Sequence, residues 1–131
     1  MKSKQLYAIL MILFGVLIIN IYSCKNELDD PKDVLNDFIK ITRGPHEYKA
    51  YDYLCKEDKK AITQSEFCRK YTPRYHLSFQ KYSISEISRM KETASYLVEF
   101  EFTSINGEKH LGEECFYLVK EDNQWKVKLP R

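Results

Sequence analysis

Residues 94–104 read ASYLVEFEFTS, and the alternation within this stretch decides the fold class of the chain. Four apolar residues occupy every second position and fall on one side of an extended backbone: Tyr96, Val98, Phe100 and Phe102. Glu99 and Glu101 lie between them and belong to the opposite, more polar side. Such alternation is typical of a β-strand with one buried face. The stretch therefore predicts a long strand whose aromatic side packs against a second layer.

The alternation of apolar and polar residues continues before and after this strand. Residues 77–88 predict a first strand or a pair of short strands, residues 111–120 a third strand, and residues 125–129 a fourth. Asn106-Gly107 is a strong hairpin signal because both residues tolerate positive φ angles, and Asp122-Asn123 turns the chain again. In the third strand one side carries Cys115, Tyr117 and Val119, and the other carries Phe116 and Leu118. We expect an antiparallel meander of about four strands.

Helical signals precede the strands. Asp30-Pro31 is a helix start, and four apolar residues follow at helical spacing before Gly44-Pro45, which predicts a helix over residues 31–43: Val34, Leu35, Phe38 and Ile39. Residues 46–55 predict a second helix, and the capping box Thr63-Gln64-Ser65-Glu66 opens a third, short one. Helices followed by an antiparallel meander define an α+β fold. We expect the helices to cover the aromatic row of the long strand.

The first 23 residues differ sharply from the rest of the 131-residue chain. Lys2 and Lys4 give a positive start, residues 6–19 are apolar throughout, and Ser23-Cys24 follows. This order is typical of an export signal. Without residues 1–23 the 21 basic residues become 19, against 19 acidic ones, so the remaining domain is formally neutral. A neutral domain lacks the excess of Lys and Arg that drives binding to nucleic acid, and no nucleic-acid partner is expected.

The end of the apolar run resembles the cleavage box of bacterial lipoprotein signals. Ile21 stands three residues before Cys24, and the small Ser23 directly precedes the cysteine. The resemblance implies a signal peptide over 1–23, a lipidated Cys24 with a polar tether over 24–30, and one α+β domain over 31–131. Two alternatives remain open: ordinary secretory cleavage, and an uncleaved anchor over residues 6–22 at the short limit for a membrane span. The favoured interpretation places the protein in the bacterial cell envelope, held on the membrane by acyl chains.

Three further cysteines lie in the domain. Cys55 and Cys68 stand near the ends of two predicted neighbouring helices and are the preferred disulfide pair, which leaves Cys115 buried between strands. Small buried thiols are the alternative for all three. The chain has no C-x-x-C motif and no metal-ligand spacing, so we expect neither a metal nor another cofactor.

The predicted elements together resemble the small exported lipoproteins of the nuclear transport factor 2-like superfamily. The resemblance rests on residues 31–38 (PKDVLNDF), residues 48–54 (YKAYDYL) and the terminal hairpin over 116–127 (FYLVKEDNQWKV). It implies a cone-shaped, cystatin-like α+β fold, in which a curved sheet wraps around helices and leaves a cavity at the wide end. It also implies two kinds of function, because some members are small cavity enzymes and many others only bind or assemble.

Candidate catalytic residues are few. His76, at the entrance to the sheet, and Asp52, between two tyrosines of the second predicted helix, are the possible proton carriers. Tyr96, Phe100 and Tyr117 are the residues expected to line a cavity. Nucleophile elbows, phosphate loops and dinucleotide motifs are missing from the sequence. We therefore expect a non-catalytic binding or assembly module with an envelope protein or glycan as partner. The alternative is a small cavity enzyme or carrier for an apolar or aromatic molecule.

Overall fold

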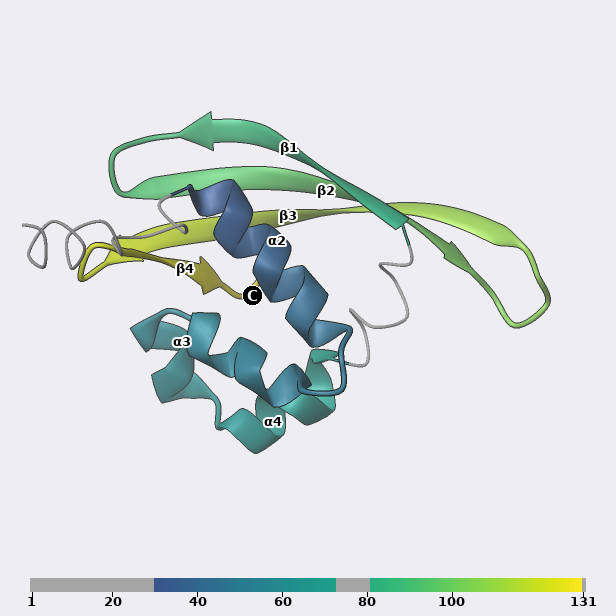
Figure 1. Ribbon diagram of the computed structural model, residues 1–131, viewed down its shortest axis with the longest axis horizontal. Coiled ribbons are helices and arrows are strands. Elements are labelled where there is room, and N and C mark those ends of the chain that lie inside the picture. The colour runs from purple at the N-terminus through teal and green to yellow at the C-terminus, as the bar shows by residue number, and fades with distance from the viewer. Residues whose placement is uncertain (1–29, 73–80, 131) are drawn as a thin grey trace, which may run out of the picture.

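The computed structural model describes residues 30–72 and 81–130, and Figure 1 shows a helical layer packed on one face of a sheet. The helical elements are α2 (Pro31–Thr42), the 3-10 helix η1 (Glu47–Tyr53), α3 (Lys56–Ala61) and α4 (Gln64–Lys70). The strands are β1 (Lys81–Arg89), β2 (Thr93–Thr103), β3 (Lys109–Glu121) and β4 (Gln124–Lys128). The predicted boundaries at residues 23 and 24 lie outside the described residues.

Helix α2 begins where the sequence predicts it. The Asp30 side chain accepts a hydrogen bond from the backbone N–H of Lys32 at 2.9 Å, and Pro31 occupies the first turn, where no N–H is required. The four apolar residues of the predicted stripe are all buried in the core: Val34, Leu35, Phe38 and Ile39. The prediction of a helix ending near residue 43 is confirmed, since Arg43 is the C-cap.

The second predicted helix is a 3-10 helix over Glu47–Tyr53 rather than an α-helix. A 3-10 helix has three residues per turn, and the three-residue spacing of Tyr48, Tyr51 and Leu54 fits that period. Helix α3 was not predicted, because its apolar content is low. Helix α4 follows the predicted capping box, in which Thr63 Oγ1 accepts from the Glu66 N–H and Glu66 Oε2 accepts from the Thr63 N–H at 2.7 Å.

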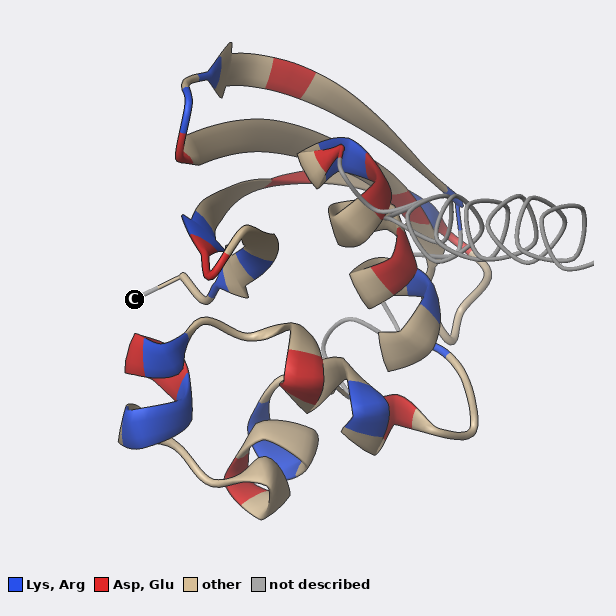
Figure 2. Ribbon diagram, turned by 60° about the vertical axis from the view of Figure 1, so that its left-hand side comes forward, with Lys and Arg blue, Asp and Glu red and all other residues tan. Residues whose placement is uncertain are grey.

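The four strands pair in the order β1-β2-β3-β4, and every pairing is antiparallel. Between β3 and β4 the chain turns on Asp122 and Asn123, both with positive φ (50° and 62°), as two-residue hairpins require. At the β2–β3 turn only Gly107 takes a positive φ, of 84°. The meander is thus confirmed, and Figure 2 shows its strands arching over the helical layer.

The core lies between α2 and the sheet. The ring of Phe38 packs edge-on against the ring of Phe116, with 6.5 Å between the ring centroids. The ring of Phe67 in α4 also contacts Phe38, with 6.3 Å between the centroids. Tyr96 and Val98 are fully buried, whereas Phe100 and Phe102 are only partly covered. The first half of the aromatic row therefore faces the helices as expected, and the second half runs beyond them along the extended β2–β3 hairpin (Figure 1). The α+β fold class predicted from the sequence is confirmed.

The helical layer is also joined to the free side of β4. Leu54 forms a parallel bridge with Val127, and the Cys55 N–H donates to the Val127 carbonyl at 3.0 Å. Next to this bridge the buried Asp58 carboxylate accepts from the Leu129 N–H at 2.7 Å. Within residues 30–72 and 81–130 no helix combines the length and the hydropathy that crossing a membrane requires.

Candidate functional site

The face of the sheet that points away from the helices is not covered by any element of the described chain (Figure 1). The described helices all lie on the other side of the sheet (Figure 1). In β2 and β3 the residues that alternate with the inward-facing ones point to this outer face. Cross-strand pairing joins them as Glu101–Leu111, Glu99–Glu113, Leu97–Cys115 and Ser95–Tyr117. We call this surface the outer sheet face. It carries apolar side chains that the helical layer does not cover.

A first groove of about 440 Å³ crosses the outer sheet face near the β2–β3 hairpin. Leu111, 84% exposed, contributes its apolar wall. Glu99 and Glu113 stand directly opposite each other on neighbouring strands, and Ser83 Oγ donates to Glu99 Oε2 at 3.4 Å. Like charges facing each other across a strand pair repel. The groove thus offers a carboxylate pair beside an exposed leucine, with Lys81 of β1 lining it opposite Glu101. The carboxylate pair and the leucine suit a cationic group on an apolar stem.

A second groove of about 380 Å³ lies at the other end of the same face. Tyr117, 54% exposed, and Val119 line it from β3, and Lys128 and Pro130 line it from the β4 end. The half-exposed aromatic ring lies beside Lys128, whose ammonium pairs with Glu57 at 3.1 Å, and this combination makes an amphipathic contact site. The two grooves together give the outer sheet face apolar contacts at both ends.

The predicted cavity residues do not gather in one place. Tyr96 is fully buried under α2, and its hydroxyl oxygen has no hydrogen-bond partner within the described part of the chain. Phe100 shares the inner face with Tyr96, and its ring lies 6.2 Å from that of Phe102. Tyr117 lies on the opposite face of the sheet, because it pairs with Ser95 and not with Tyr96. Tyr117 and Tyr96 therefore do not share a cavity, although Phe100 lines the first groove and Tyr117 lines the second.

Burial dominates the environment of Tyr96. Desolvation, reinforced by the negative charges of Asp30 and Glu86, raises the pKa of the Tyr96 hydroxyl from 10.0 to about 12. The phenol is therefore neutral at physiological pH and cannot act as a base. Tyr82, a neighbour on β1, donates its hydroxyl to Asn36 Oδ1 at 2.7 Å, and the Arg43 guanidinium lies 5.8 Å from its ring centre. These contacts fasten α2 to the sheet.

Of the two possible proton carriers, His76 lies outside the described residues. Asp52 is exposed on η1, and neither described groove includes it. The Asp52 backbone carbonyl accepts from two ammonium groups, Lys126 Nζ at 3.0 Å and Lys59 Nζ at 3.3 Å. Burial and then the neighbouring Lys59 lower the pKa of Lys126. Asp52 therefore binds two lysines through its backbone carbonyl, and its carboxylate lines neither of the two described grooves.

The three described cysteines are free thiols, so the predicted bridge between Cys55 and Cys68 is not formed in this structure. Cys55 is buried, and its Sγ donates to Asp58 Oδ2 at 3.2 Å, which gives the thiol a partner within α3. Cys115 is exposed rather than buried, because it lies on the outer sheet face opposite Leu97. Burial raises the pKa of both Cys55 and Cys68, which makes them poor nucleophiles. Cys24 is outside the described residues.

Metal binding finds no support in the described residues, among which no group of three or more His, Cys, Asp or Glu side chains is placed to hold an ion. The carboxylates of the first groove are instead partly paired with cations, as Lys109 Nζ lies 3.4 Å from Glu101 Oε1. The residues that fit a binding surface best, Leu111 and Glu113, were not singled out in the sequence. The signal that could have found Leu111 is a large apolar residue on the polar side of an alternating strand.

Comparison with solved structures shows the fold. A Campylobacter jejuni protein described as an NTF2-like transpeptidase, known from its crystal structure, superposes with a TM-score of 0.54 at 16% sequence identity. The match covers 77% of this chain and 99% of that protein's chain. No family model matches the sequence, and no curated protein matches it either. The chain therefore has a nuclear transport factor 2-like α+β fold, with amino-terminal helices on an open four-stranded antiparallel sheet, as the sequence resemblance implied.

Proposed function

We propose that this protein is a non-catalytic binding module of the bacterial cell envelope, tethered to the membrane by a lipid on Cys24. In this proposal the outer sheet face binds an envelope protein. The observation that carries it is the uncovered sheet face, with Leu111 84% and Tyr117 54% exposed at its two grooves. Exposed apolar side chains rimmed by charged ones are typical of protein interaction sites.

The charges of the outer sheet face favour a partner that presents a cationic side chain. Glu99 and Glu113 repel each other across β2 and β3, and a Lys or Arg from the partner relieves that repulsion while its alkyl stem packs on Leu111. A protein surface supplies such side chains together with apolar anchors. A glycan without free amino groups supplies no cation, and it is therefore the weaker candidate as occupant of the first groove.

The alternative function is a cavity enzyme or carrier of the same fold. The name of the similar Campylobacter jejuni protein includes an enzymatic activity, that of a transpeptidase. The described residues of this chain offer little for such chemistry, because Asp52 is exposed, Cys55 is buried with a raised pKa, and the exposed Cys115 stands opposite Leu97. The crosslinking experiment described next therefore includes a result that would favour this alternative.

Photocrosslinking in intact envelopes tests the proposal. The full chain carries a photoreactive phenylalanine at position 111, 117 or, as a control, 105, which is fully exposed in the β2–β3 turn. We expect one protein adduct from positions 111 and 117 and none from position 105, and we expect Glu99→Lys to abolish the adduct at position 111. Adducts of equal yield at all three positions, or an apolar ligand that copurifies while no adduct forms, would overturn the binding role.

The lipid anchor is tested separately in the same cells. Labelled palmitate should appear on the wild-type chain and be absent from the Cys24→Ala variant. Cys24, which follows Ile21 and Ser23 in the predicted cleavage box, is the residue proposed to carry the lipid. An unlabelled wild-type protein in the soluble fraction would contradict the tether and leave the binding face to be judged on the crosslinks alone.

A further inference from the structure

We infer that the β1–β2 turn is a second membrane contact, in which Ile87 and Met90 enter the interfacial region of an anionic bilayer and Lys91 meets the lipid phosphates. The inference rests on the proposed lipid anchor at Cys24. It adds a defined orientation to that anchor, because a single acylated residue fixes the distance of a domain from the membrane but not the face that it presents.

The start of the fold lies beside this turn. Asp30 Oδ2 lies 3.5 Å from Arg89 Nη1, so the N-terminus of α2 and the end of β1 are in contact. Five residues separate Cys24 from Asp30, and the six steps of an extended chain span at most about 3.6 Å each, or about 20 Å in total. A lipid on Cys24 therefore keeps Asp30 within about 20 Å of the headgroups, with the end of β1 beside it.

The turn presents its apolar side chains to solvent. Ile87 is 56% exposed and Met90 is 69% exposed, although both are large hydrophobic residues in a chain with a well-formed core. The backbone that carries them is held in place, since the Met90 N–H donates to the Thr93 carbonyl and the Lys120 N–H donates to the Glu92 carbonyl, both at 2.8 Å. Exposed apolar side chains on a fixed backbone can enter the interfacial region of a bilayer without a rearrangement of the fold, and the proposed lipid anchor supplies the bilayer.

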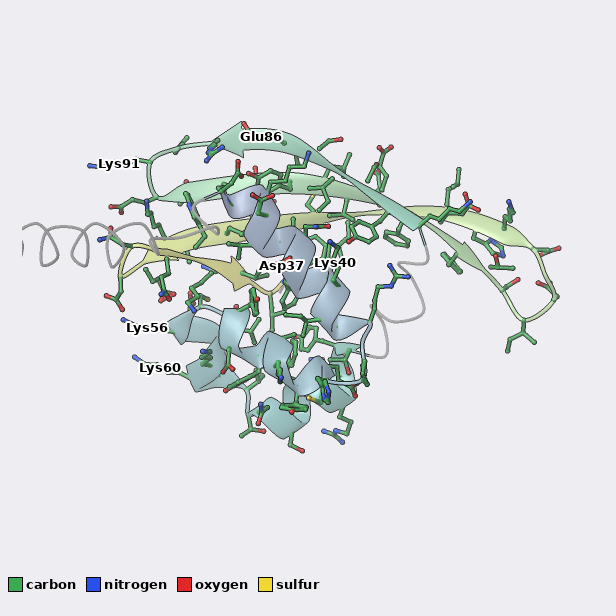
Figure 3. The ribbon with its side chains drawn as sticks, in the orientation of Figure 1. Asp37, Lys40, Lys56, Lys60, Glu86 and Lys91 are labelled. Carbon is green, nitrogen blue, oxygen red and sulfur yellow. The ribbon has the colours of Figure 1, made fainter. Side chains whose placement is uncertain are left out.

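Basic and acidic side chains both lie at this end of the molecule, where Glu92 follows Lys91 in the turn and Arg89 pairs with Asp30. Figure 3 shows Lys91, Lys56 and Lys60 pointing away from the body of the protein at the end that carries the β1–β2 turn. Figure 2 brings this end forward and shows Lys and Arg interspersed with Asp and Glu at the β1–β2 turn and on α3. Acidic groups are present as well, and Asp122 pairs with Lys56 at 2.6 Å. Lys60 and Lys91 form no ion pair within residues 30–72 and 81–130, so both remain available to anionic headgroups.

The opposite end of the sheet supplies a matched control. Thr93 and Thr103 bound β2, and eleven residues of strand separate the two turns by about 33 Å at about 3.3 Å per residue. Ile105, in the β2–β3 turn, is also a fully exposed hydrophobic residue. Figure 1 shows the two turns at opposite ends of the sheet. If the β1–β2 turn touches the membrane, Ile105 points away from it.

Quenching by brominated lipid tests the contact. Full-length, lipidated protein carrying Met90→Trp or Ile105→Trp is reconstituted into vesicles of phosphatidylglycerol with brominated acyl chains, and Trp125, which is buried, supplies a constant background. We expect the indole at position 90 to lose about half of its fluorescence, because interfacial side chains lie about 5–10 Å into the headgroup and acyl boundary. The indole at position 105 should lose none.

Two further measurements complete the test. Adding Lys91→Glu to Met90→Trp should reduce the quenching, and so should replacing phosphatidylglycerol by brominated phosphatidylcholine, since both remove the electrostatic attraction. Equal quenching at positions 90 and 105, or none at either in a palmitate-labelled protein, would overturn the contact while leaving the anchor intact. A chain that carries no palmitate would overturn the anchor and, with it, the contact.

Discussion

Asp58 of α3 accepts a hydrogen bond at 2.7 Å from the backbone N–H of Leu129, a residue 71 positions later in the chain. The same carboxylate oxygen accepts from Cys55 Sγ, and the Asp58 residue is only 4% exposed. We predict that Asp58→Ala lowers the free energy of unfolding by about 2–3 kcal/mol, because it leaves the Leu129 N–H buried without a partner. Urea denaturation followed by circular dichroism measures this change.

Glu57 provides the matched control for this prediction. It precedes Asp58 on α3, is exposed, and pairs with Lys128 at 3.1 Å. Glu57→Ala should lower the free energy of unfolding by less than about 1 kcal/mol, as removal of an exposed ion pair does. Equal losses in the two variants would show that the bond to Leu129 contributes no more than a surface contact.

Tyr96→Phe should stabilise the protein by up to about 1 kcal/mol, because it removes a buried hydroxyl that has no partner at hydrogen-bonding distance within the described residues and only interacts with the neighbouring Glu86. Tyr82→Phe should have the opposite effect, with a loss of about 1 kcal/mol, since the Tyr82 hydroxyl donates to Asn36 at 2.7 Å. Thermal melts of both variants beside the wild type give the comparison. A destabilised Tyr96→Phe would mean that its hydroxyl has a partner after all.

The raised pKa of Tyr96 also predicts a dependence of stability on pH. In the unfolded chain the phenol ionises near its ordinary pKa of 10.0, whereas burial raises the pKa in the folded protein to about 12. The folded state then binds more protons than the unfolded state, so the free energy of unfolding falls as the pH rises from about 10 to 12. Tyr53 and Tyr82, whose pKa values burial also raises, act in the same direction. Denaturation curves should show a smaller alkaline loss for Tyr96→Phe than for the wild type.

The exposure of the thiols predicts the order in which they react. Cys115 is exposed on the outer sheet face, Cys68 is partly buried and Cys55 is buried. Burial raises the pKa of Cys68 and of Cys55, and thiolates are the reactive form. Under native conditions iodoacetamide should therefore modify Cys115 first and Cys55 last. A non-reduced digest that contains a peptide pair joined through Cys55 and Cys68 would restore the disulfide predicted from the sequence.

Repulsion between Glu99 and Glu113 should lower the free energy of unfolding by a measurable amount. Glu99→Gln is expected to raise the free energy of unfolding by a few tenths of a kcal/mol at low salt, because the two carboxylates face each other across β2 and β3. In 1 M sodium chloride the gain should vanish, since charges are then screened within about 3 Å. Glu101→Gln is the control, as Glu101 pairs with Lys109 and its loss should bring no gain. A gain that persists at high salt would argue against repulsion.

Much of the fold could be predicted because its elements carry strong local signals. Asp30-Pro31, the capping box at Thr63 and the alternation around Val98 each specify one element without help from the rest of the chain. The 3-10 helix η1 and the short α3 were harder to predict. Their backbone is fixed by tertiary contacts, such as the bridge from Leu54 to Val127, which no local pattern contains.

The candidate site could not be predicted, because it depends on register. The sequence places Cys115 and Tyr117 on one side of a strand and Phe116 on the other, but it does not say which side faces the helices. A shift of one residue exchanges the two sides. The observed pairing of Tyr96 with Phe116 sends Tyr117 and Cys115 outward, and it is also what brings Glu99 opposite Glu113.

The bridge between Leu54 and Val127 has a consequence for the order of folding. Helix α2 and η1 are made early in the chain, but their docking partner β4 is the last of the described strands. Closing so long a loop costs entropy before the contacts at Asp58 and Leu54 can repay it, which slows folding. Helix α2 can pack on β1 and β3 before β4 is in place, through Tyr82 and Phe116. The bridge at Leu54 and the bond from Leu129 to Asp58 form only when β4 and the residue after it are present. We therefore expect the attachment of η1 and α3 to the edge of the sheet to be the last step of folding.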